Sequence, residues 1–296
     1  MAACRQCPRN CDLDRSRGAL GFCGAPQEFL VARAALHPWE EPFLSGTRGS
    51  GTIFFCGCNL QCVFCQNREI SRGRVGKSIT SDELADLMLR LRDAGAHNIN
   101  LVTPSHYALQ LIPVLEKLKP TLGIPVVYNC GGYEKVETLR QLEGLVDIYL
   151  PDFKYFSSEL SKKYSGASDY FEVASEALAE MLRQRPETVF DGEGMLERGV
   201  VLRHLVLPGA RGDSIALLNA LAERFGTNAF LLSLMSQYTP EFASDCNYPE
   251  LHRRLTTFEY ESVLKRVEAL GFEGCIQGRS SASSSYTPDF YEKSFL

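Results

Sequence analysis

The chain has 296 residues, enough to bury a sizeable core either as one large α/β barrel or as two ordinary domains. Its hydrophobic fraction of 45% and charged fraction of 23% are those of globular proteins, which excludes disordered, collagen-like and fibrous classes. The formal net charge of −5 argues against nucleic-acid binding as the main activity.

The cysteines are unusual in number and in position. Eight of the eleven lie in the first 65 residues. The chain begins without an apolar run behind a basic start, and no stretch approaches the roughly 18 apolar residues of a membrane span, so we expect a cytoplasmic protein without a membrane partner. Cysteines in a reducing compartment seldom form disulfides, and an odd number cannot all pair. Metal or redox chemistry is therefore favoured.

Regular elements are expected from about residue 52 onwards. Residues 1–35 form a Cys-rich segment too small for a core of its own, and residues 36–51, with their prolines and glycines, are expected to form a connecting loop. Short β-branched and apolar runs predict strands at 52–56, 98–102, 124–128, 146–150, 200–206, 229–234 and 274–277. Apolar periodicity predicts helices at 81–91, 109–115, 135–145, 169–184, 215–225 and 257–270.

Several helix ends carry their own signals. Thr80 with Glu83, and Thr256 with Glu259, have the spacing of capping boxes. Asp213 is expected to be the N-cap of the helix at 215–225. On the helix at 109–115 we expect Leu109, Ile112 and either Val114 or Leu115 to face the core.

Six strand–helix alternations predict a parallel sheet covered by helices, as an open doubly wound sheet or as a partial barrel. In both architectures ligands gather at the carboxyl ends of the strands. The repeat defines a central domain at 36–277, followed by a Ser-rich tail at 278–296. The residues that follow each strand are therefore the candidates for a functional site.

Three cysteines follow the first strand of the repeat. Cys58, Cys62 and Cys65 are spaced four and then three residues apart, so one loop can give three irons of a cubane cluster a protein ligand and leave the fourth iron open. An open coordination position on a metal is where a substrate or cofactor binds. A buried loop of free cysteines, or a three-ligand zinc site, is the alternative.

With Phe64 before the third cysteine and the six-unit repeat, the chain resembles the radical S-adenosylmethionine (SAM) superfamily over about residues 50–277. The resemblance implies a partial (β/α)6 TIM-type barrel, a [4Fe-4S] cluster on Cys58, Cys62 and Cys65, and SAM bound to the open iron. It also implies reductive cleavage of SAM to a 5′-deoxyadenosyl radical that abstracts a hydrogen atom from the substrate.

The same resemblance points to residues around SAM. After the second strand, where many members carry Gly-Gly-Glu, this chain departs from the pattern with Thr103-Pro104-Ser105-His106. The alternatives are that Ser105 merely caps a helix, that Asp152 and Lys154 form a solvated ion pair, and that His204 is a core histidine. The expected cofactor-binding residues are Phe64, Ser105, His106, Asn129, Asp152, Lys154, His204, Gln237 and Tyr238.

The first 25 residues carry four further cysteines. Cys4, Cys7, Cys11 and Cys23 supply enough thiolates for a structural zinc or for a second, fully ligated iron–sulfur cluster, and their spacing does not choose between the metals. A zinc site would fold this segment outright. The remaining cysteines, at 56, 130, 246 and 275, are expected to be free and buried.

Two further motifs narrow the resemblance. Asp152-Phe153-Lys154 resembles the Asp-x-Lys pair of pyruvate formate-lyase activating enzymes, and Cys7-Pro-Arg-Asn-Cys11 resembles the start of a group of such proteins with an extra N-terminal cysteine segment. This implies an oxidoreductase that activates a glycyl-radical enzyme, with that protein and an electron donor such as flavodoxin or ferredoxin as partners. The alternative is radical modification of a small molecule or another polypeptide. An iron–sulfur electron carrier and a zinc-dependent barrel hydrolase are less favoured.

Two peripheral stretches have expected roles of their own. Arg68, Arg72, Arg74 and Lys77 form a basic stretch that is either a solvated loop or a contact for an acidic partner. The Ser-rich tail ends in Phe290, Tyr291 and Phe295, and we expect these aromatics to dock and close the open end of the barrel.

Overall fold

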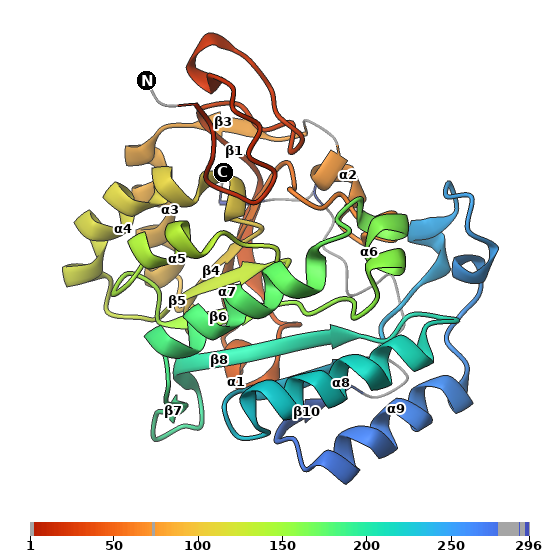
Figure 1. Ribbon diagram of the computed structural model, residues 1–296. Helices are drawn as coiled ribbons and strands as arrows, with labels where there is room; N and C mark the ends of the chain where they lie inside the picture. The colour runs from red at the N-terminus through yellow and green to blue at the C-terminus, as the bar shows by residue number, and fades with distance from the viewer. Residues whose placement is uncertain (1–2, 73–74, 278–289, 291–293, 296) are drawn as a thin grey trace.

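The computed structural model describes residues 3–72, 75–277, 290, 294 and 295. The strands form one sheet in the order β10-β9-β8-β6-β5-β4-β2-β1-β3, with β7 paired to β8. Every pairing from β2 to β10 along this order is parallel, whereas β1 and β3 continue the sheet in antiparallel fashion. Among the described strands β10 and β3 stand at opposite ends of the order, so the barrel is partial, as predicted (Figure 1).

The predicted strands all form, most within a few residues of the expected ends. They are β2 Ser50–Phe55, β4 Ile99–Val102, β5 Val126–Cys130, β6 Ile148–Pro151, β8 Leu196–Leu205, β9 Leu231–Met235 and β10 Gly274–Ile276. Three strands were not expected: β1 Phe29–His37, β3 Lys77–Ile79 and the two-residue β7 Val189–Phe190. Because β1 begins at Phe29 and pairs with β2, the sheet takes in part of the segment expected to stand apart at 1–35.

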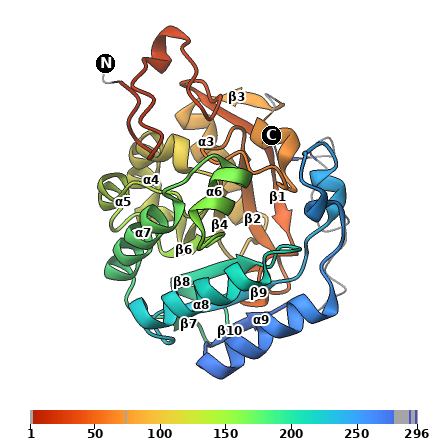
Figure 2. The same ribbon diagram turned by 45° about the vertical axis from the view of Figure 1, so that its right-hand side comes forward.

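Helices cover the outside of the sheet, and α8 and α9 lie side by side next to β8 and β9 (Figures 1 and 2). The long ones are α3 Ser81–Asp93, α4 Ala108–Leu122, α7 Tyr170–Gln184, α8 Arg211–Phe225 and α9 Thr257–Leu270. The short ones are α1 Pro42–Ser45, α2 Arg68–Arg72, α5 Val136–Gln141 and α6 Ser158–Ser165. Single 3-10 turns occupy Arg15–Arg17, Ser105–Tyr107, Pro240–Ala243 and Pro249–His252.

Both capping boxes are confirmed, because the Thr80 and Thr256 hydroxyls accept from the backbone three residues on and the glutamates return the bond. The N-cap predicted at Asp213 is wrong. Helix α8 begins two residues earlier, at Arg211, and the Asp213 carboxylate instead accepts from the backbone N–H groups of Phe156 and Ser157 at 3.0 and 2.7 Å. The carboxylate thus fixes the loop before α6 rather than its own helix.

The buried face of α4 differs from the expectation. Leu109 is 38% exposed, whereas Leu111, Val114 and Leu115 are buried against the sheet. The helix begins one residue before Leu109, and its first turn is tied to the N-terminal segment, where the Gln6 side-chain oxygen accepts from the Leu109 N–H at 3.0 Å. The buried apolar stripe therefore begins at Ala108 and continues through Leu111, and Leu109 is not part of it.

Residues 36–51 are more than the expected connecting loop. Within them the short helix α1 places Leu44, which is fully buried, against Val127, Ile148 and Val201 on three neighbouring strands. These side chains form an apolar plug at the amino-terminal end of the barrel. The plug closes the amino-terminal end of the barrel.

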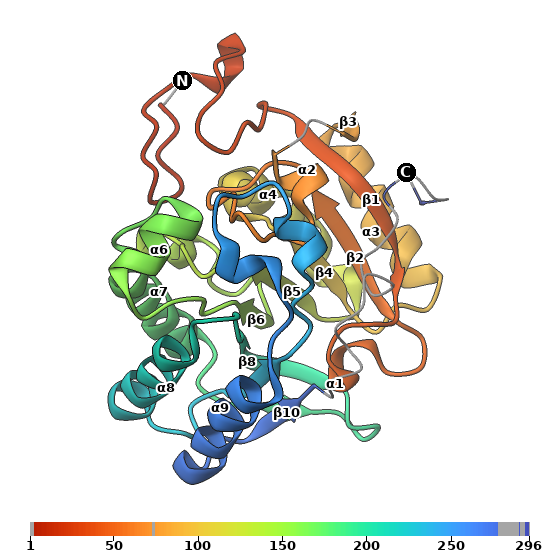
Figure 3. The same cartoon turned by 90° about the vertical axis from the view of Figure 1, so that its right-hand side faces the viewer.

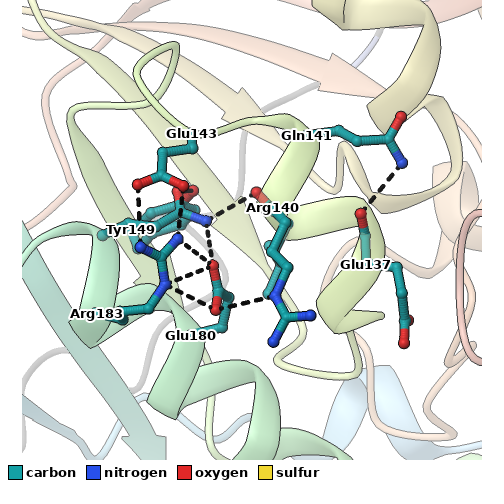
Figure 4. A network of polar contacts seen from close by, with 9 residues as sticks. Glu137, Arg140, Gln141, Glu143, Tyr149, Glu180 and Arg183 are labelled. Carbon is teal, nitrogen blue, oxygen red and sulfur yellow. Dashed lines mark hydrogen bonds and ion pairs between the residues drawn. The ribbon is translucent and has the colours of Figure 1, made fainter.

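Outside the barrel, α5 and α7 are joined by a polar network (Figure 4). Arg183 donates to Glu143 and to Glu180, and Glu180 also accepts from the Gln184 amide at 2.8 Å. The Tyr149 hydroxyl of β6 donates to the Gln184 side-chain oxygen at 2.6 Å, which ties the helices to the sheet.

The described end of the chain lies against the first strands of the sheet. Phe290 is 9% exposed and meets Phe54 edge to face with ring centroids 5.5 Å apart, and the Phe295 N–H donates to the Ala34 carbonyl at 2.8 Å. Tyr291 and the serines at 280–285 lie outside the described residues, as does Arg74 of the basic stretch. In the part of the chain that the structure describes, no helix has the length and apolar character to cross a membrane.

Candidate cofactor site at the mouth of the barrel

The three-cysteine loop leaves β2 at Gly57 and occupies the carboxyl end of the sheet. Gly57 has a φ of 89°, and a Cβ there would stand 2.6 Å from the Cys23 carbonyl oxygen, so only glycine fits where the loop passes the N-terminal segment. Within the loop the Leu60 N–H donates to Cys58 Sγ at 3.3 Å. The Ser165 hydroxyl at the end of α6 donates to Cys62 Sγ at 3.0 Å.

The environment of these thiols suits metal ligands. Burial raises the pKa of Cys58 to about 12, with Cys62 and Cys65 adding to the effect, and burial also raises the pKa of Cys65. Thiols held protonated in this way ionise when a metal binds, and N–H and O–H donors to sulfur are the partners that cluster thiolates require.

No group of three or more Cys, His, Asp or Glu side chains among the described residues is already arranged as a metal site. The fit to a cluster therefore rests on the donor types, their spacing and their shared cavity.

One cavity of about 640 Å³ joins the loop to the barrel interior. All three cysteines line it, and so do six of the nine residues expected around SAM: Phe64, Asn129, Asp152, Lys154, Gln237 and Tyr238. These residues come from the loop and from the ends of β5, β6 and β9. The fold thus brings together residues that are far apart in the sequence, such as Gln66 and Gln237, which are in contact although 171 positions separate them.

Asp152 and Lys154 form an ion pair at the mouth of the barrel. Lys154 Nζ lies 2.6 Å from an Asp152 carboxylate oxygen, and the side chains are only 18% and 25% exposed. Burial opposes the charge of Lys154, but Asp152 and then Cys62 raise its pKa above the ordinary value, so the ammonium persists. The pair is largely buried in the cavity wall, which argues against a solvated surface pair.

Three expected residues lie outside the cavity lining. The Ser105 hydroxyl donates to the buried Glu134 carboxylate. His106 Nε2 lies 2.8 Å from the Cys56 carbonyl oxygen, and burial lowers the pKa of His106 to about 3. His204 is held between the Phe153 carbonyl and the Ser214 hydroxyl, at 2.7 and 2.9 Å.

Burial likewise lowers the pKa of His204 to about 4. Each of these three side chains already has a protein partner, and both histidines are neutral. They brace the loops that carry the site.

Two groups of residues at the site were not predicted from the sequence. One is the set of supports behind the cluster loop, in which the Tyr155 hydroxyl lies 2.6 Å from Ser165 Oγ, which in turn contacts Cys62. The other is the floor, where Glu40 and Glu41 meet Arg203 of β8.

The N-terminal segment packs onto the cluster loop (Figure 3). The Arg9 guanidinium donates to the Asn59 carbonyl of the loop at 2.7 Å, and to the Ser165 and Gly166 carbonyls at the end of α6 at 2.9 and 2.6 Å. From the loop side, the Gln61 amide donates to the Phe22 carbonyl at 2.7 Å. The segment is therefore a part of the site's scaffold.

The four N-terminal cysteines lie close enough to influence one another. Burial raises the pKa of Cys7 to about 12, with Cys23 and Cys4 among the neighbours that add to it. Burial also raises the pKa of Cys23, with Cys4 and Cys11 adding to it. Four thiols in one small segment form a donor set of the kind that holds zinc or an iron–sulfur cluster.

A partial parallel barrel with three thiols on the loop after its first parallel strand defines a class of metal-cluster enzyme. The sequence model of the Radical SAM superfamily matches residues 52–197 of this chain. An uncharacterized protein of Methanocaldococcus jannaschii is 32% identical over 274 residues, which cover 90% of this chain and 74% of that protein. The chain belongs to the radical SAM superfamily, and the family implies a [4Fe-4S] cluster and SAM as cofactors.

Solved structures agree on the fold. Methylornithine synthase superposes with a TM-score of 0.50 and 18% identity, covering 74% of this chain and 60% of that one. Streptococcus suis SuiB bound to the precursor peptide SuiA gives a TM-score of 0.51 and 12% identity, covering 80% of this chain and 51% of SuiB. This chain thus spans about half to three fifths of the length of these two proteins, and at such identities the likeness shows the fold alone.

Proposed function

We propose that this radical SAM enzyme activates a glycyl-radical enzyme by removing a hydrogen atom from a backbone glycine of that protein. The observation that carries the proposal is the placement of Asp152 and Lys154 in the wall of the cluster cavity, since this pair resembles the Asp-x-Lys of pyruvate formate-lyase activating enzymes. The unclosed sheet supports it, because an open side of the barrel can admit a polypeptide loop.

The residues at the mouth have separable roles in this proposal. Cys58, Cys62 and Cys65 would hold the cluster. Lys154 would bind the carboxylate of SAM and Asp152 its ammonium group, because each offers the opposite charge in a partly dry wall. When bound, the cluster and SAM together supply the 5′-deoxyadenosyl radical. The aromatic rings of Phe64 and Tyr238 line the same cavity and would exclude water around the reacting atoms.

The electron needed for each cleavage comes from a partner in this proposal. Arg68 and Arg72 lie in α2 directly behind the cluster loop, and the Arg72 guanidinium donates to the Gln61 carbonyl at 3.1 Å. Glu69 also lies in α2, and Arg68 is paired with Asp245, so the exposed Arg72 is the side chain here that fits an acidic electron donor such as flavodoxin or ferredoxin, which a cytoplasmic location would supply.

A second metal centre is also proposed for the N-terminal segment, as zinc or as a second iron–sulfur cluster on Cys4, Cys7, Cys11 and Cys23. Metal analysis decides between them. A structural zinc gives about one zinc and about four irons per chain, whereas two cubanes give about eight irons.

The test of the central proposal is anaerobic. The protein is reconstituted with iron and sulfide, dithionite and SAM are added, and 5′-deoxyadenosine is measured, with Cys58→Ala expected to abolish the product. Cys246→Ala is the matched control, since Cys246 lies outside the cavity lining. A wild-type protein with an intact cluster that forms no 5′-deoxyadenosine would contradict radical SAM activity.

Glycyl-radical activation needs its own readout. Mixed with its target enzyme, the reconstituted protein should produce the paramagnetic resonance signal of a glycyl radical in stoichiometric relation to 5′-deoxyadenosine. SAM cleavage without a glycyl-radical signal, in the presence of the glycyl-radical enzymes of the same cell, would support radical SAM activity but would reject a glycyl-radical enzyme as the substrate.

A further inference from the structure

The floor of the cluster cavity is built from three buried charged side chains. Arg203 donates to both carboxylate oxygens of Glu41, from Nε at 2.7 Å and from Nη2 at 2.6 Å, and Nη2 also donates to Glu40. The side chains of Glu40, Glu41 and Arg203 are 8%, 4% and 14% exposed. All three line the cavity that reaches the cluster cysteines.

The charges of this floor do not balance. The bidentate contact with Arg203 neutralises Glu41, and Lys154 neutralises Asp152 higher in the same cavity. Glu40 and Glu41 both accept from the same nitrogen of Arg203, Nη2. Among the described residues, the other side-chain donor to Glu40 is the neutral Asn100 amide, at 2.9 Å. His37, the other basic group lining the cavity beside Glu40, has its pKa lowered by burial. Among the residues that the structure describes, one carboxylate charge of this floor therefore has no matching cation in a region of low dielectric, which is costly unless a ligand supplies one.

Two neutral polar groups at the same level also lack partners. Ser45 lines the cavity one turn after Glu41, is 2% exposed, and its hydroxyl has no hydrogen-bond partner. The Asn100 side-chain oxygen is completely buried and likewise has none, although its amide nitrogen is bound to Glu40. Of the two residues only Ser45 lines the cavity, so its hydroxyl oxygen and the surplus negative charge of Glu40 are what this end of the cavity offers to a ligand, while Asn100 holds Glu40 from behind.

We propose that Glu40 and Ser45, where they line the floor of the cavity, bind a cationic group of the substrate, a primary ammonium or a guanidinium. Such a group carries several N–H donors and one positive charge, and so satisfies the unpaired acceptors and the excess charge together. The inference rests on the proposed radical chemistry at the mouth. It adds that the substrate enters the barrel with a lysine-like or arginine-like end pointing to the floor and its reacting carbon toward the cluster loop.

Arg203 lies between this cation site and the proposed SAM site, because its backbone pairs with Asp152 while its side chain holds Glu40 and Glu41. Asp152 and Lys154 at the strand ends provide for the amino-acid part of SAM, whereas Glu40 approaches from the segment before α1, which plugs the opposite end of the barrel. A polypeptide glycine flanked by a basic residue fits this arrangement, and so does a free basic amino acid or amine.

The experiment measures ligand binding and needs no turnover. The reconstituted protein is titrated anaerobically with n-butylamine, agmatine, n-butanol and butyrate, with and without SAM, and binding is followed by the rise of the thermal midpoint. We expect the two cations to bind and the alcohol and the anion not to. Glu40→Gln should weaken cation binding at least tenfold, and Glu40→Asp, which keeps the charge, should retain the preference for cations. The exposed Glu241→Gln, outside the cavity lining, is the matched control and should bind cations like the wild type.

Three results would overturn the proposal. Cations that bind Glu40→Gln as tightly as the wild type would show that the charge at the floor is not used. Absence of cation binding to a folded protein that does bind SAM would make the floor a purely structural ion network. A tenfold loss of SAM affinity in Glu40→Gln, measured by the same titration, would assign the cation to SAM itself. Failure of SAM to bind the wild type would instead count against the proposed function, and the amine titration without SAM would still decide the role of the floor.

Discussion

Glu134 offers the sharpest test of the structure behind the cluster loop. Its side chain is buried between the ends of β4 and β5, where it accepts hydrogen bonds from Ser105, from Tyr128 at 3.1 Å and from the Cys130 thiol. All three donors are neutral. Burial therefore dominates and raises the pKa of Glu134 from 4.5 to about 7, although the three hydrogen bonds oppose the shift.

The sign and size of the effect on stability follow from this pKa. Between pH 4.5 and 7 the unfolded chain has lost the proton while the folded chain keeps it, so stability is fully present below pH 4.5 and falls as the pH rises through 7. At about 1.4 kcal/mol per pH unit, the whole interval costs about 3 kcal/mol, of which about 2 kcal/mol falls between pH 5.5 and 7.

Urea denaturation at pH 5.5 and pH 8, under anaerobic reducing conditions, measures this contribution. In Glu134→Gln the free energy of unfolding should not show this decline with rising pH. The difference in unfolding free energy between the wild type and the variant should therefore change by about 2 kcal/mol between the two pH values. The exposed Glu137→Gln should show the same pH dependence as the wild type. If Glu134→Gln and the wild type decline in parallel, the reasoning about this buried carboxyl is refuted.

Three further predictions concern the site and its scaffold. Ser165→Ala removes the hydrogen bond to Cys62 and should lower the reduction potential of the cluster in a spectroscopically monitored redox titration, while Ser161→Ala, whose hydroxyl serves only the helix backbone, should not. Lys154→Met should weaken SAM binding at least tenfold in a calorimetric titration with no change in iron content, and an unchanged affinity would remove Lys154 from the SAM site. Thr80→Ala breaks the capping box of α3 and should lower the free energy of unfolding by about 1 kcal/mol in urea, with a loss below a few tenths contradicting the cap.

The sequence predicted the features that are encoded locally. The βα repeat, both capping boxes and the cysteine loop at a strand end are patterns of a few adjacent residues, and the structure confirms their places. Six cofactor candidates line the cavity because the carboxyl ends of parallel strands must meet at one edge. Their identity as candidates came from the family resemblance and the order of the strands.

The missed features depend on contacts between distant residues. Glu40 and Arg203 are 163 residues apart, and Ser165 and Cys62 are 103 apart, so no local window contains either pair. The segment at 36–51 has the Pro and Gly content of a loop, but its Leu44 fills the barrel because three strands leave an apolar space there. His106 and His204 illustrate the reverse case. Their residue type suits a ligand, yet neighbouring carbonyls and a hydroxyl already hold them.

The contacts of Arg9 bear on how the protein is made. Arg9 joins the cluster loop to the carbonyl of Gly166, which lies 157 residues later in the chain. At typical synthesis rates the ribosome needs roughly 10–30 s to cover that distance, and during this time the N-terminal cysteines have emerged without their anchor. The hydrogen bonds of Arg9 to the end of α6 can form only after α6 has left the ribosome, so the packing of the N-terminal segment onto the cluster loop is completed late in synthesis.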